Sequence, residues 1–249
     1  MNKMKRFLFV VCCGVAILGC SSKQRFPIDK RFWTPEDYQT VIFEIQYQTP
    51  KDELYPKFSD PENAVVIQKL VDAQNYLVVA DDKELGLNYK NEVTKEFFHK
   101  YRDLYDTYKG MDVQDKYIYP EELIAVEKFG LGLQIYYFKL GNDRIAEQAD
   151  AADSTDTKRV LTSNRQTIIG NFNLYLDNVK DEKRFGSYAP SLAEGITTHF
   201  FKLIETFPDA NYGEMLAKAK GMSAKTQIPE IKTALDGLVS KIEAMKKPV

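Results

Sequence analysis

The chain of 249 residues has few of the side chains that most catalytic and metal sites use. It contains two histidines, His99 and His199, and no cysteine after position 20. No H-E-x-x-H sequence and no cluster of cysteine and histidine occurs, so a zinc site would take most of its ligands from carboxylates. A glycine-rich phosphate loop, a G-x-S-x-G turn and an S-x-x-K pair are also absent. The sequence therefore nominates no catalytic residue, no metal ligand and no cofactor.

An excess of positive charge is missing too. The chain has 34 basic and 36 acidic residues, which gives a net charge of −2. Nucleic-acid-binding domains usually carry a basic stripe, so we expect no nucleic acid among the partners. Hydrophobic residues make up 44% of the chain and aromatic residues 12%, which is enough for a folded core and excludes a disordered chain.

The N-terminus has an apolar run that is too short to cross a membrane. Residues 7–18 form this run, and Lys3, Lys5 and Arg6 precede it. A membrane-spanning helix needs about 20 apolar residues. A basic start, a short apolar stretch and small residues at its end are typical of a secretory signal peptide, which we assign to residues 1–19.

The end of this segment, Ile17-Leu18-Gly19-Cys20, resembles the lipobox of bacterial lipoproteins. The resemblance implies cleavage between Gly19 and Cys20, a diacylglycerol on the Cys20 sulfur and an acylated new amino terminus. Two or more acyl chains hold a protein on a bilayer stably, whereas one chain does so only marginally. The lipid bilayer is thus an expected partner through acylated Cys20, and the mature chain would have no cysteine left for a disulfide.

The residues after Cys20 indicate the location. In lipoproteins of the enterobacterial kind, serine at the place of Ser21 directs the protein to the outer membrane. The segment 21–25 has no acidic residue, whereas surface-exported lipoproteins of some bacteria carry an acidic tract there. We therefore expect a lipid-anchored protein on the periplasmic face of the outer membrane, in preference to the cell surface.

Cleavage would leave 230 residues with 31 basic and 36 acidic side chains, enough for one sizeable domain or two small ones. Residues 20–33 are interpreted as a lipidated tether, either a solvated linker or, through its lysines and arginines, a segment near anionic headgroups. Residues 34–249 are interpreted as a helical periplasmic domain.

Helical patterns cover most of this domain. Thr34-Pro35-Glu36-Asp37 and Asp60-Pro61-Glu62 resemble helix starts, with a cap, proline and acids in the first turn. Apolar spacing predicts further helices, at residues 91–108, 120–140, 157–181, 191–207, 212–220 and 228–245. Only residues 76–80 and 116–119 are strand candidates. We predict an all-α bundle or irregular array of about seven to eight helices.

Two helices stand out. Residues 123–140 are apolar nearly all round, which predicts the central, most buried helix. Gly130 and Gly132 weaken it by about 1 kcal/mol each relative to alanine, which indicates a close helix contact there. Gly141-Asn142 is expected to stop or kink it. The last helix has a heptad seam from Ile228 to Met245, which favours a helix docked in a bundle over a free coiled coil.

Three functions remain open. The leading hypothesis is a protein–protein accessory or scaffold subunit of a bacterial envelope complex, with an envelope protein as partner. The alternatives are an enzyme that acts on peptidoglycan or glycan through carboxylates, and a periplasmic ligand carrier with a closed apolar cavity. The candidate carboxylates for the enzyme are Glu121, Glu122, Glu127 and Glu194, since glycoside chemistry uses two carboxyl groups about 5–10 Å apart.

Overall fold

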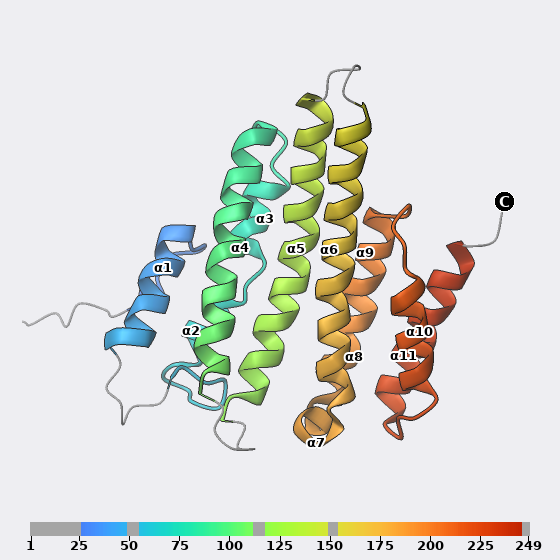
Figure 1. The fold of residues 1–249 in the computed structure, drawn as a ribbon. Coiled ribbons are helices and arrows are strands. Elements are labelled where there is room, and N and C mark those ends of the chain that lie inside the picture. Colours follow the sequence, from blue (N-terminus) through green and yellow to red (C-terminus); the bar gives the residue numbers. More distant parts are fainter. Residues whose placement is uncertain (1–25, 49–54, 112–117, 149–153, 246–249) are drawn as a thin grey trace, which may run out of the picture.

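The computed structural model describes residues 26–48, 55–111, 118–148 and 154–245 (Figure 1). The predicted all-α class is confirmed, because this part of the chain is mostly helical and has no strand. The number of helices also agrees with the expectation, since several of the labelled segments are single turns or continue into one another. Gly19 and Cys20, the predicted cleavage and lipidation site, lie outside the described residues.

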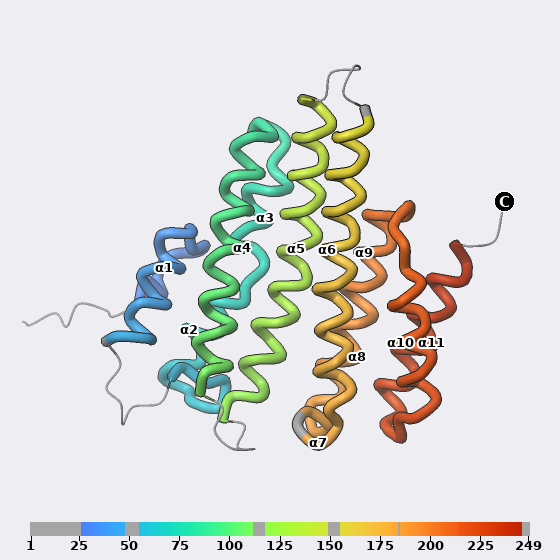
Figure 2. The backbone as a smooth tube through the Cα atoms, viewed as in Figure 1, coloured from blue at the N-terminus to red at the C-terminus, as the bar shows by residue number. Residues whose placement is uncertain are grey.

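Three long helices stand side by side at the centre of the array: α4 (Leu87–Lys109), α5 (Pro120–Gln148) and α6 (Ser154–Lys180). Figures 1 and 2 show α5 between the other two, and α5 packs on both of them. The short α2 (Ala64–Leu70) and α3 (Gln74–Ala80) lie on the α4 side. The helix α1 (Pro35–Phe43), which continues into the π-helical turn η1 (Glu44–Gln48), forms one end of the array.

The other end is built by the C-terminal part of the chain. A short α7 (Glu182–Phe185) leads into α8 (Ala189–Gly195), the π-helical segment η4 (Ile196–Phe200) and α9 (Phe201–Thr206), which are continuous. They pack against α5 and against α11 (Pro229–Met245), and α11 pairs with α10 (Gly213–Ser223). The last helix is therefore docked in the array, as its seam predicted: Ile231, Leu235, Leu238 and Ile242 are buried.

The helix α5 is central, as predicted. One apolar core, from Phe26 to Leu140, lies on the α4 side, and a second, from Ile124 to Ile242, lies on the α6 side. Only α5 contributes strongly to both, because its apolar residues point in all directions. Consequently the two halves of the array are joined through this one helix.

Glycines allow the close approaches that were expected on α5. A methyl group at Gly130 would lie 2.2 Å from the ring of Tyr101, and one at Gly132 would lie 2.8 Å from the hydroxyl of Tyr76. The prediction of close helix contacts there is thus confirmed. A third close approach joins α6 to α8, where a methyl group at Gly195 would lie 2.1 Å from the hydroxyl of Tyr175.

The described end of the expected tether is packed, which corrects the interpretation of these residues as a solvated linker. Phe26 and Trp33 are buried in the first core. The Trp33 backbone N–H donates to Asn75 Oδ1 at 2.8 Å, and its indole Nε1 donates to the Pro27 carbonyl at 2.9 Å. The cap at Thr34 is confirmed: its side chain accepts from the Asp37 N–H, and Asp37 accepts from the Thr34 N–H.

Side-chain hydrogen bonds explain two differences before α4. The helix expected from Asp60 begins only at Ala64, because Asp60 accepts from the Glu62 N–H and from Asn63 Nδ2 and so closes a turn. The apolar pattern after Asp60 is also divided into two helices near Asp72, whose carboxylate accepts from the N–H of Gln74, the first residue of α3. The strand candidate 76–80 is wrong, since these residues belong to α3.

Three more expectations from the sequence differ from the structure. The second strand candidate is also wrong where it is described, because Ile118 and Tyr119 precede α5 without forming a strand. Gly141-Asn142 does not end α5, which runs on to Gln148; Asn142 Oδ1 accepts from Asn164 Nδ2 of α6 at 2.9 Å, and this bond supports the added turns. Val160, an apolar residue of the predicted helix 157–181 that its pattern would place inside, is 38% exposed; Figure 1 shows the first turns of α6 beside α5 but above the end of α9.

Candidate functional site

A groove runs along α5 between α4 and α6, with a volume of about 660 Å³. Its floor is one stripe of α5, at Glu127, Leu131, Gln134 and Phe138. Their spacing of four, three and four residues places them on one face of the helix. We call this feature the central groove; its walls are helices that pack on α5 rather than on each other.

The two walls differ in chemistry. The α4 wall carries three aromatic side chains together with one basic and one acidic residue: Phe98, Tyr101, Tyr105, Arg102 and Asp106. The α6 wall is mostly polar and consists of Asn164, Thr167, Asn171, Leu174, Tyr175 and Asn178. An aromatic wall thus faces a wall of carboxamides across a floor that mixes apolar and polar residues.

The three asparagines of the α6 wall are seven residues apart, and all of them donate toward α5. Asn171 Nδ2 donates to Gln134 Oε1 at 2.7 Å, and Asn178 Nδ2 donates to Glu127 Oε1. Asn164 Nδ2 donates to Asn142 Oδ1. A carboxamide has both a donor and an acceptor end, so each of these three lining residues also has a carbonyl oxygen that can accept a hydrogen bond.

The aromatic wall is held in place by packing. The rings of Phe98 and Tyr137 are stacked, with centroids 4.7 Å apart and planes 9° apart. The ring of Tyr101 lies over Gly130, which has no side chain to exclude it. Burial, with a smaller contribution from the nearby Glu127 carboxylate, raises the pKa of Tyr101 well above its ordinary value, so its hydroxyl stays protonated.

A smaller hollow of about 230 Å³ continues the groove toward the end of α5. It shares Tyr137, Phe138 and Asn164 with the larger part and adds residues that include Lys95 and Arg144. Arg144 donates to Glu92 Oε1 at 3.0 Å and to Asn91 Oδ1 at 3.3 Å. From Glu127 to Gln148 the floor helix rises about 30 Å, so the combined groove is long and narrow.

The four candidate carboxylates are not gathered in one cleft. Glu122 is buried and accepts from the Phe58 N–H at 2.8 Å; burial raises its pKa. Glu194 is exposed and forms an ion pair with Lys128 at 2.6 Å. Glu121 is exposed at the start of α5, and only Glu127 lines the central groove, with Asp106 as the other acid there.

The two histidines lie on different elements. His99 is exposed on α4. His199 lies in η4 against Gly132, where burial and the neighbouring Lys128 ammonium lower its pKa to about 4. Its imidazole is therefore neutral near pH 7, which fits a packed residue beside the helix contact.

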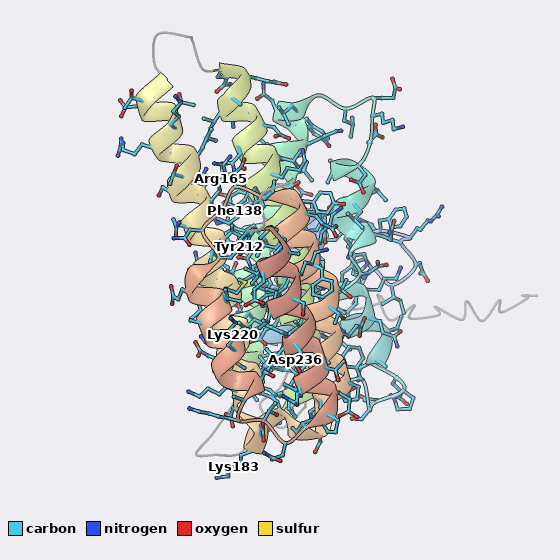
Figure 3. All side chains as sticks on the ribbon, turned by 90° about the vertical axis from the view of Figure 1, so that its right-hand side faces the viewer. Phe138, Arg165, Lys183, Tyr212, Lys220 and Asp236 are labelled. Atoms are coloured by element: carbon cyan, nitrogen blue, oxygen red, sulfur yellow. The ribbon has the colours of Figure 1, made fainter. Side chains whose placement is uncertain are left out.

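The two ends of the array have different surfaces. At the α1 end Phe43 and Tyr47 are 49% and 69% exposed, and their ring centroids are 5.0 Å apart. We call these two residues the edge pair. The α10–α11 end, seen in Figure 3, carries ion pairs instead, with Lys220 on Glu243 at 2.5 Å and Lys232 near Asp236 at 3.7 Å.

Apart from Glu127, sequence reasoning did not identify the lining of the central groove. The asparagines at 164, 171 and 178 have a seven-residue period that could have marked one polar face of the helix. Within the described ranges, no three His, Cys, Asp or Glu side chains are placed to hold a metal ion. No helix among residues 26–245 that the structure describes is both long and apolar enough to span a bilayer.

Comparisons with known proteins add nothing to this geometry. No protein-family profile, no curated protein and no solved structure matches the chain.

Proposed function

We propose that the protein is an outer-membrane-anchored lipoprotein that acts as an accessory or scaffold subunit of an envelope complex, and that it contacts a partner protein through its α1 end. The observation that carries the proposal is the edge pair. Two aromatic rings packed on each other and exposed to solvent are typical of the centre of a protein–protein contact, where Tyr and Phe are enriched.

The place of the edge pair in the array supports this interpretation. Helical arrays usually close their ends with polar residues, because an uncovered apolar face invites another element to pack on it. The α10–α11 end follows this rule through its ion pairs. The α1 end has an ion pair too, Lys30 with Asp37 at 2.6 Å, but its outermost helix and turn also expose Phe43 and Tyr47. A further element packed on α1 would continue the array.

The proposed anchor would bring this end close to the membrane. Phe26 packs in the same core as Tyr38 of α1. Phe26 lies six positions after Cys20, and six residue steps span at most about 22 Å. A lipid on Cys20 would therefore hold the α1 end beside the outer membrane, where the partner is expected to be a membrane protein or another membrane-anchored protein.

The alternative of a carboxylate enzyme has less support. Two of its four candidate acids have structural partners, Glu122 on the Phe58 N–H and Glu194 on Lys128, and a third, Glu121, lies outside the groove. Glu127 accepts from Asn178. The ligand-carrier alternative called for a closed apolar cavity, whereas the central groove has an exposed lip at Leu174 and a polar wall.

A pull-down from membranes tests the partner. The lipidated protein should recover one envelope protein in a fixed ratio, and the double variant Phe43→Asp/Tyr47→Asp should lose it. Tyr89→Asp is the matched control, because Tyr89 is 55% exposed on α4 and lies outside the edge pair. Equal recovery by both variants, or repeated recovery of the lipoprotein alone, would refute the proposal.

The anchor has a separate test. Cys20→Ala should abolish incorporation of radiolabelled palmitate and release the protein from membranes or leave its signal peptide uncleaved. Unchanged labelling would show that Cys20 does not carry the lipid.

A further inference from the structure

We propose that the central groove binds a linear strand of β-1,4-linked sugars through its uncharged sugar rings, such as the polysaccharide backbone of the cell wall. The inference goes beyond the proposed function, since it concerns a different surface from the edge pair. It rests on the shape of the groove, the chemistry of its walls and the spacing of the α6 asparagines.

The shape of the groove favours a linear polymer over a compact ligand. The two hollows share three lining residues and together follow α5 over about 30 Å, and Leu174 at the lip is 64% exposed. Pockets for small molecules usually bury most of their ligand. A long open groove instead lets a chain enter along its side and extend beyond both ends.

The charge of the groove favours a ligand with little net charge. The main part has one basic side chain, Arg102, and two acids, Asp106 and Glu127. The continuation adds Lys95 and Arg144, and Arg144 is paired with Glu92. Since positive and negative groups nearly balance, the groove does not select a polyanion or a polycation.

The α6 wall matches a ligand rich in hydroxyl groups. Asn164, Asn171 and Asn178 line the groove and each donate toward α5 through Nδ2, which leaves each with a carbonyl oxygen that can accept from a ligand. Seven residues of helix rise about 10.5 Å, which is close to the length of one disaccharide unit in an extended β-1,4-linked strand. Successive acceptors on the wall would therefore meet equivalent hydroxyl or amide donors on successive disaccharides.

The α4 wall supplies the complementary contact. A sugar ring has an apolar face of C–H groups, and an aromatic side chain offers a flat apolar surface with, in tyrosine, a polar tip. Phe98, Tyr101 and Tyr105 occur three and four residues apart on the side of α4 that lines the groove. A strand lying between the walls would thus contact aromatic rings on one side and carboxamides on the other.

The same lining fits an extended peptide less well. Peptides in grooves depend on apolar anchors that fill pockets at defined intervals. Leu174 is the only aliphatic residue on the α6 wall. An extended peptide repeats its backbone pattern about every 6.7 Å, which does not match the asparagine spacing.

Isothermal titration of the full mature protein in detergent with N-acetylglucosamine oligomers of two, four and six units tests the proposal. The asparagine row spans about 21 Å, or two disaccharides, so the tetramer should bind at least tenfold more tightly than the dimer. The oligomer of six α-1,4-linked glucose units should bind at least tenfold more weakly than the N-acetylglucosamine hexamer, because its coiled repeat does not match the wall.

Variants assign the binding to the groove. Asn171→Ala should weaken tetramer binding at least fivefold, and Gln166→Ala, an exposed carboxamide of α6 outside the groove, should leave it unchanged. Thr167 is exposed on the wall, so Thr167→Arg should fold normally and block the strand. The thermal midpoint of each variant shows that the fold is retained.

Three results would overturn the proposal. They are no binding of oligomers or purified cell-wall sacculi, binding that does not depend on oligomer length, and binding that Thr167→Arg leaves unchanged. Capture of a polypeptide in the groove by a photo-crosslinker at position 167, in place of glycan, would also refute it. None of these outcomes affects the pull-down through the edge pair.

Discussion

Gly195→Ala tests whether the close approach of α6 and α8 depends on a missing side chain. A methyl group at this position would lie 2.1 Å from the Tyr175 hydroxyl oxygen and 2.8 Å from the adjacent ring carbon. Tyr175 is only 3% exposed, and its hydroxyl donates to the Leu192 carbonyl at 3.1 Å. The ring therefore has little space into which it can move.

The magnitude follows from three effects. Overpacking of a core costs about 1–3 kcal/mol, and loss of the buried hydrogen bond costs about 1 kcal/mol more. Replacing glycine by alanine inside a helix raises the free energy of unfolding by about 1 kcal/mol, which offsets part of this loss. The free energy of unfolding should thus fall by about 1–3 kcal/mol. Gly170→Ala, on α6 with no atom near the new methyl group, should instead raise it by about 0.5–1 kcal/mol.

Urea unfolding followed by circular dichroism measures these changes. A double-mutant cycle isolates the contact: in the Tyr175→Phe background the hydroxyl is gone, so Gly195→Ala should cost at least about 1 kcal/mol less than in the natural chain. If Gly195→Ala were as stable as Gly170→Ala, or if Tyr175→Phe did not reduce its cost, the reasoning about this contact would be wrong.

Three further predictions concern the pH dependence, the N-terminal segment and the groove. The pKa of His199 in the folded chain, about 4, lies below its unfolded value of about 6.5, so protonation favours the unfolded chain. The free energy of unfolding should therefore fall by about 2–3 kcal/mol as the pH decreases from about 6.5 to 4. His199→Gln should flatten this part of the pH profile, and an unchanged slope would contradict the assignment. Asn75→Ala should lower the free energy of unfolding by about 2–3 kcal/mol, since it leaves the buried Trp33 N–H without its acceptor and removes the bond to the Lys69 carbonyl. The exposed Asn88→Ala should change it by under about 0.5 kcal/mol, and equal effects in urea unfolding would refute the role of Asn75. Gly130→Ala should push the Tyr101 ring into the central groove and so weaken the binding of the N-acetylglucosamine oligomers, as measured by isothermal titration. An unchanged affinity would show that this ring does not border the ligand.

Local sequence signals predicted most of the helices because they act within a few residues. The Thr34 cap, the end of the predicted helix 91–108 within one residue of the end of α4, and the all-round apolar α5 agree with the structure. The errors occurred where a side chain or a neighbouring helix changed the outcome. Asp72 accepts a backbone hydrogen bond where α2 and α3 separate. Gly141 predicted the end of α5, but Asn142 accepts a hydrogen bond from α6 and the helix continues.

The central groove could not be predicted in the same way. Its residues come from three helices, and which faces of them meet depends on the packing of α4 and α6 on α5. The glycines of α5 indicated close contacts but not their partners, Tyr101 and Tyr76. The exposure of Phe43 and Tyr47 is equally nonlocal, because it depends on α1 being the end of the array.

Site-specific photo-crosslinking in living cells tests the central claim, a protein contact at the α1 end, most directly. A photoreactive phenylalanine at position 47 should give one crosslinked band containing an envelope protein, and the band should depend on Cys20. The same residue at position 160, an exposed apolar site of α6, should give none. Identical patterns at both positions, or no protein crosslinked at position 47, would contradict the account.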